Sequence, residues 1–89
     1  MKNNNMEREE IKERLKSIIK PFAKETEVFD NLSETTDFIN DLKINSANLV
    51  DIVLDIEDDF QIVIDDQSME KMLNVKSAID IIESKLHQL

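Results

Sequence analysis

Three stretches of the chain repeat apolar residues at intervals of three and four, the spacing that places side chains on one face of an α-helix. The first stretch carries Ile11, Leu15, Ile18 and Ile19. Pro21 should end or kink this helix, because proline lacks the N–H of a continuing helix and its ring clashes with the preceding turn. The second stretch carries Leu49, Ile52, Val53, Ile56 and Phe60. The third carries Val75, Ala78, Ile79, Ile82 and Leu86, and Asn74 is expected to cap it.

The segment between the first two helices, residues 22–45, is interpreted as a long connection with local turns. A bare loop of this length is unusual in a small domain, so its apolar side chains should pin it across the helices. Those residues are Val28, Phe29, Leu32, Phe38 and Leu42. Phe38 and Leu42 are spaced to share one face of a short helical turn.

A second connection follows the predicted helix that ends at Phe60. Residues 62–64, Ile-Val-Ile, are too short for a confident strand and have no obvious pairing partner, so we interpret them as a packed connector. The acids at 65–66 can cap a short third helix around residues 68–73, which would bury Met69, Met72 or Leu73. Zero Gly and one Pro also favour helices over hairpins. The predicted fold class is all-α, a small four-helix bundle with a long first connection and a short third helix.

Length and composition indicate one module. A chain of 89 residues is long enough for one modest core. We expect residues 1–5 to be a disordered N-terminus and residues 6–89 to form a single domain. Zero Cys excludes a disulfide-stapled scaffold and a thiolate metal site. The opening is polar and no uncharged apolar run is long enough to cross a bilayer, so we expect no membrane insertion and a cytoplasmic location.

The charge distribution restricts the partners. The formal net charge is −9, which repels nucleic acid phosphates and anionic membrane surfaces. The charge is also uneven, since no basic residue lies between Lys43 and Lys71 while that interval carries eight acids. We therefore expect basic protein partners and no nucleic acid.

The sequence contains no pattern typical of a catalytic site or a metal-binding site. The single histidine, His87, lies near the C-terminal end of the sequence, and no nucleophile is placed beside it. The acid pairs Asp58-Asp59 and Asp65-Asp66 lack the spacing and the glycine of a calcium-binding loop. We assign no catalytic residue and no metal site.

One segment does point to a function. The triplet Asn45-Ser46-Ala47 opens an amphipathic helix with acidic outer positions that ends at Phe60, and the segment 38–42 (Phe-Ile-Asn-Asp-Leu) precedes it. The Ile-Val-Ile connector and residues 75–79 (Val-Lys-Ser-Ala-Ile) follow. In these features the chain resembles acyl carrier proteins from about Ile11 to Leu86. It departs from the family pattern where Asn45 replaces the usual Asp, Ala47 the usual Leu, and Lys43 a common Gly.

The resemblance implies a carrier function. The serine that matches Ser46 carries a 4′-phosphopantetheine arm, which a phosphopantetheinyl transferase takes from coenzyme A, and the terminal thiol of the arm holds an acyl chain as a thioester. A serine at a helix start also lies beside unpaired backbone N–H groups, which suit a phosphodiester anion. The carrier would deliver acyl intermediates to fatty-acid, lipid or polyketide-type biosynthetic enzymes, and we expect it to be a monomer.

The helix after Ser46 offers a docking surface for those enzymes. Asp51, Asp55 and Asp58 follow one another at four and three residues and would meet basic docking patches. Val50 and Leu54 are the expected apolar contacts within this acidic face. Asn45 and Ala47 flank the serine and complete the predicted partner-docking residues.

Two alternatives remain open from the residues. A peptidyl or aminoacyl carrier, such as a D-alanyl carrier, uses the same serine and arm with a different cargo. An unmodified acidic helical adaptor would instead bind a basic protein through the aspartates alone. Replacing Ser46 with Ala separates the carriers from the adaptor, because only the carriers need the hydroxyl.

Overall fold

The computed structural model describes residues 7–24, 27 and 30–87. Within these residues the α-helices are α1 (Arg8–Ile19), α3 (Leu49–Phe60), α4 (Asp66–Glu70) and α5 (Val75–Leu86), with the 3-10 turns η1 (Lys20–Phe22) and η2 (Ser46–Asn48). The described part contains no strand beyond a single isolated bridge, between Asp37 and Asn74. This confirms the all-α prediction, with α4 as the short helix. The expected pins Val28 and Phe29 and the predicted disordered residues 1–5 lie outside the described residues.

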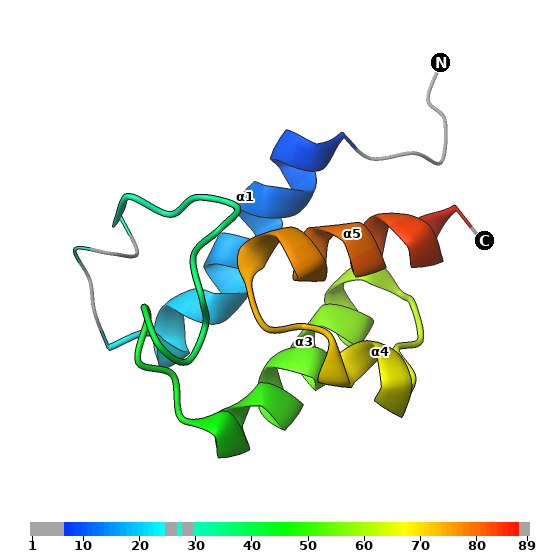
Figure 1. Cartoon of the computed structure of the whole chain (residues 1–89). Coiled ribbons are helices and arrows are strands. Elements are labelled where there is room, and N and C mark those ends of the chain that lie inside the picture. The colour runs from blue at the N-terminus through cyan, green and yellow to red at the C-terminus, as the bar shows by residue number, and fades with distance from the viewer. Residues whose placement is uncertain (1–6, 25–26, 28–29, 88–89) are drawn as a thin grey trace.

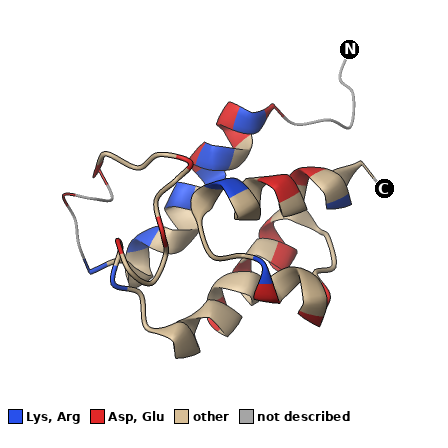
Figure 2. Cartoon of the chain, in the orientation of Figure 1, with Lys and Arg blue, Asp and Glu red and all other residues tan. Residues whose placement is uncertain are grey.

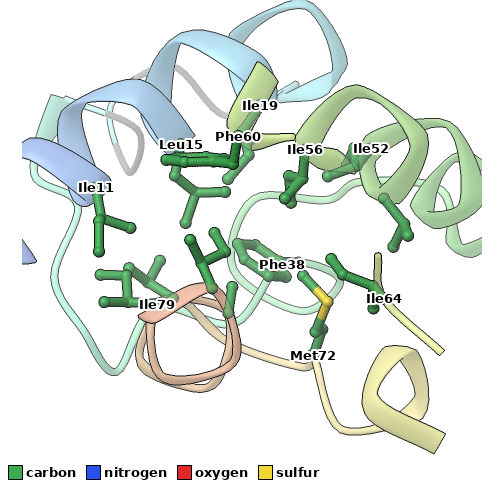
Figure 3. Close-up of a cluster of buried hydrophobic side chains, with 14 of the residues drawn as sticks. Ile11, Leu15, Ile19, Phe38, Ile52, Ile56, Phe60, Ile64, Met72 and Ile79 are labelled. Atoms are coloured by element: carbon green, nitrogen blue, oxygen red, sulfur yellow. The ribbon is translucent and has the colours of Figure 1, made fainter. Parts of the chain in front are cut away.

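Helix α1 packs against both α5 and α3, and the long connection runs along one side of the bundle (Figure 1). The predicted apolar stripes meet in one core between these helices (Figure 3). Nearly every stripe residue is buried, and only Ile18 and Leu49 are partly buried at its edge. Helix α1 ends where proline was expected to end it, since Pro21 lies in the 3-10 turn that follows.

The long connection is held by backbone hydrogen bonds to Leu73 and to the first residue of α5. The N–H of Phe38 donates to the carbonyl of Leu73 at 3.1 Å, and the N–H of Val75 donates to the carbonyl of Thr36 at 3.0 Å. The expected pins Leu32, Phe38 and Leu42 are all buried. These bonds satisfy polar backbone groups that would otherwise be costly inside a small core.

The second connection is a packed connector, as predicted. Ile62 and Ile64 are buried while Val63 is 77% exposed, which explains the strand-like alternation. The carboxylate of Glu57 accepts the N–H of Ile64 at 2.7 Å and holds the connector against the end of α3.

Helix α4 begins earlier than the predicted 68–73. The Asp65 carboxylate accepts the N–H of Ser68 at 2.9 Å, and this cap starts the helix at Asp66. Met72 is therefore buried in the segment after the helix, and Leu73 is 55% exposed.

Two arginines tie α1 to the other long helices. Arg8 Nη1 donates to Asp80 Oδ1 at 2.8 Å and to Glu83 Oε1 at 3.0 Å on α5. Arg14 Nε donates to Asp59 Oδ2 at 3.0 Å, and its guanidinium carbon lies 4.9 Å from the centroid of the Phe60 ring. These contacts leave Asp80 and Glu83 half-buried.

Candidate functional site

Ser46 begins the 3-10 turn η2, immediately before α3. Asn45 has an extended backbone, with φ −65° and ψ 131°, and its side chain caps the turn by accepting the N–H of Ala47 at 2.9 Å. The carbonyl of Asn45 accepts the N–H of Asn48 at 2.8 Å, and the carbonyl of Ser46 accepts the N–H of Leu49. The sequence predicted unpaired N–H groups beside the serine. That prediction is wrong for Ala47, Asn48 and Leu49, because their N–H groups already donate to acceptors in the short turn and its cap.

The Ser46 side chain is open to solvent. The residue is exposed, and within the described part of the chain its hydroxyl forms no hydrogen bond. By contrast, Ser17 Oγ donates to the carbonyl of Glu13 at 3.4 Å, and Ser33 Oγ lies 3.1 Å from Thr35 Oγ1. The Ser46 side chain is therefore accessible from solvent and has no hydrogen-bond partner in this part of the chain.

The face of α3 that points away from the core combines apolar and acidic side chains. Val50 is 49% exposed and Leu54 is 55% exposed. Asp51, Asp55 and Asp58 are also exposed, and at 100° per residue they fall on the same side of the helix as the two apolar residues. Figure 2 shows acidic residues on α3, α4 and α5, with Lys and Arg concentrated along α1. We call Asn45, Ala47, Val50, Asp51, Leu54, Asp55 and Asp58 the α3 face; Asn45 and Ala47 are exposed at its serine end.

Other kinds of site receive no support in the described residues. Residues 7–24, 27 and 30–87 contain no group of three or more His, Cys, Asp or Glu side chains arranged to hold a metal ion. No helix in these ranges is long and apolar enough to span a membrane. His87 is exposed at the end of α5.

Comparison with known proteins decides the family, although no family model matches the sequence. The chain is 37% identical over 82 residues to the acyl carrier protein of Coprothermobacter proteolyticus, covering 92% of this chain and 98% of that protein. It is 39% identical over 80 residues to the acyl carrier protein of Lactobacillus acidophilus, covering 89% and 96%. The chain belongs to the acyl carrier protein family.

A solved structure supports the same family assignment. The fold is similar to that of an acyl carrier protein from Enterococcus faecalis, with a TM-score of 0.74 and 30% sequence identity over 90% of this chain and 99% of that one. The resemblance inferred from the sequence is thus confirmed, and the peptidyl-carrier and adaptor alternatives are not favoured. Acyl carrier proteins transport acyl groups and leave the chemistry to other enzymes, so the family assignment agrees with a non-catalytic role.

The structure also explains why glycine is common at one position where this chain departs from the family pattern. Lys43, where acyl carrier proteins commonly have Gly, has a φ of 59°, in the left-handed region that glycine adopts without steric cost. Gln61, after α3, has a φ of 57°. The glycine that is common at this position in the family is the sequence signal for a positive φ, and Lys43 lacks that signal.

Proposed function

We propose that this chain carries acyl intermediates as thioesters on a 4′-phosphopantetheine arm attached to Ser46 Oγ, and delivers them to fatty-acid, lipid or polyketide-type biosynthetic enzymes. The observation that supports this most strongly is an exposed serine, free of hydrogen bonds within the described part, directly before a helix with an outer face both apolar and acidic. A cytoplasmic location and a monomeric state remain part of the prediction.

The residues around Ser46 fit the arm. The exposed hydroxyl leaves room for a bulky phosphodiester, and the group would supply a terminal thiol that this chain lacks, since it has zero Cys. Asn45 fixes the turn from which the serine projects, through its 2.9 Å hydrogen bond to the Ala47 N–H. In the transfer, Ser46 Oγ would form the new P–O bond as the pyrophosphate bond of coenzyme A breaks, with the nucleotide leaving and the serine proton passing to a base of the transferase.

The α3 face would dock the transferase and the acyl-processing enzymes. Its aspartates attract basic patches and speed the encounter, while Val50 and Leu54 provide a small apolar contact that orients it. Exposed charge pairs contribute little affinity, because salt and solvent screen them. Fast and weak docking suits a carrier that must visit several enzymes in turn.

The attachment is tested by intact-mass spectrometry of the chain incubated with coenzyme A and the transferase of its host. We expect one phosphopantetheine adduct, mapped to Ser46 by fragmentation, and no adduct on Ser46→Ala. Ser84→Ala, an exposed serine on α5, is the matched control and should be modified normally. An adduct on Ser46→Ala, or no adduct on the parent chain, would contradict the proposal.

The docking face is tested separately with the same transferase. Replacing Asp51, Asp55 and Asp58 together with Asn should lower kcat/KM and reduce its salt dependence, because the attraction to a basic patch is lost. The charge-matched control replaces Glu9, Glu10 and Glu13, three exposed acids on α1, together with Gln and should leave kcat/KM almost unchanged. Equal effects of the aspartate and control variants would show that net charge, and not this face, governs docking.

A further inference from the structure

A phosphodiester on Ser46 would add a negative charge at the start of α3, where three of the neighbouring N–H groups already have acceptors. The N–H groups of Ala47, Asn48 and Leu49 already donate to acceptors within the turn, so they are not available to the phosphate. Asp51 is exposed on the first turn of α3, and its negative charge would oppose a second anion at this end of the helix. A cation near Ser46 would offset this repulsion.

Lys43 is placed to be that cation. Ile44 is 1% exposed and points into the core, whereas Lys43, Asn45 and Ser46 are exposed, so Lys43 lies on the outer surface with the serine. The N–H of Ile44 donates to the carbonyl of Phe38 at 3.0 Å, which fixes the backbone next to Lys43. The Cα atoms of Lys43 and Ser46 are separated by at most about 11 Å of chain. The flexible stem of a lysine and the projection of the phosphate from Oγ together cover a distance of that order.

The surroundings of Lys43 leave its charge available. No carboxylate of the described residues forms an ion pair with it. The neighbouring Asp41 carboxylate accepts the N–H of Asp37 at 2.8 Å. The N–H of Lys24 donates to the carbonyl of Leu42 at 3.1 Å, which brings a second exposed lysine beside this segment and adds to the positive potential.

We infer that the ammonium group of Lys43 binds the phosphodiester of the arm on Ser46. This contact limits rotation about the bonds nearest the phosphate and keeps the start of the arm close to Lys43. The inference rests on the proposed function. Because the arm is covalently attached, the two charges meet at a high effective concentration. Exposed ion pairs of this kind give a ratio of engaged to released phosphate of about 1.4 to 5 at low salt, and the ratio falls as salt screens the charges.

The test uses phosphorus NMR of the modified protein. The ³¹P resonance of the parent should shift as sodium chloride is raised, and its transverse relaxation rate should fall as the phosphate is released. Lys43→Gln should show the high-salt shift and rate already at low salt, and Lys43→Arg should behave like the parent. Glutamine is a suitable replacement because Gln61 adopts the same left-handed conformation in this chain.

Lys71→Gln is the matched control, since Lys71 is an exposed lysine at the end of α4. It should leave the ³¹P shift and its salt dependence unchanged. Identical ³¹P behaviour of the parent and Lys43→Gln would overturn the inference, as would equal changes in Lys43→Gln and Lys71→Gln. Intact mass of each sample distinguishes failure of the proposed function from failure of this inference. Absence of the arm from Ser46 contradicts the proposed function, whereas an attached arm with a ³¹P signal that does not depend on Lys43 contradicts only this inference.

Discussion

Replacement of Lys43 by Gly should stabilise the fold, although glycine usually destabilises. The left-handed conformation costs an L-residue about 1–2 kcal/mol, and glycine avoids this cost. Glycine in turn loses about 0.5–1 kcal/mol more conformational entropy on folding than other residues. The middle of each range leaves a gain of about 0.75 kcal/mol in the free energy of unfolding. For a domain of this size the melting temperature should rise by about 2–8 °C.

Thermal unfolding followed by far-UV circular dichroism measures this change. The control is Lys71→Gly, which removes the same charge and adds the same residue at φ −92°, where glycine has no steric advantage. We expect Lys71→Gly to lower the melting temperature while Lys43→Gly raises it. An equal loss in both variants would refute the argument from the positive φ of Lys43.

Three further predictions concern the cap, the acid response and the core. Asn45→Ala removes the acceptor of a backbone N–H and should cost about 0.5–2 kcal/mol in urea unfolding, whereas Asn45→Asp keeps the acceptor and should cost far less. Hydrogen bonds from Lys76 and then Arg8 hold the pKa of Asp80 below its ordinary value of 3.8. The stability from Asp80 is therefore present above pH 3.8 and lost as the pH falls through the lowered pKa, so Asp80→Asn should melt below the parent at neutral pH and match it in acid. A deficit that persisted unchanged in acid would contradict that assignment. Ile79→Val, at a side chain with 0% exposure, should cost about 0.5–1.5 kcal/mol, and a neutral result would show that the core relaxes around the lost methylene.

The helices were predictable because their periodicity is a local property of the sequence. The stripe from Ile52 to Phe60 must be buried, and the same helix geometry places Asp51 and Asp55 outside. The caps at Asn74 and Asp65 were also readable, since a short polar side chain bonds a backbone N–H only a few residues away. The start of α4 was misplaced because the prediction followed the apolar side chains Met69 and Met72, whereas the Asp65 cap marks the true start at Asp66.

Contacts between distant segments were not predictable. Nothing local indicates that Arg8 meets Asp80 and Glu83, because the packing of α1 on α5 creates that group. The path of the long connection likewise depends on hydrogen bonds between Phe38 and Leu73, far apart in sequence. Such pairs follow from the arrangement of the helices in space and not from the helix propensity of the local sequence.

The sequence by itself determined the helical class, the buried stripes, the resemblance to acyl carrier proteins and the choice of Ser46 with its acidic helix, because each depends on residues within a few turns of one another. Only the tertiary structure decided that Lys43 adopts a positive φ and that Lys43 and Ser46 are both exposed while Ile44 between them is buried. The physical reason is that the backbone around Lys43 is fixed by hydrogen bonds to Lys24 and Phe38, which only the folded chain brings near.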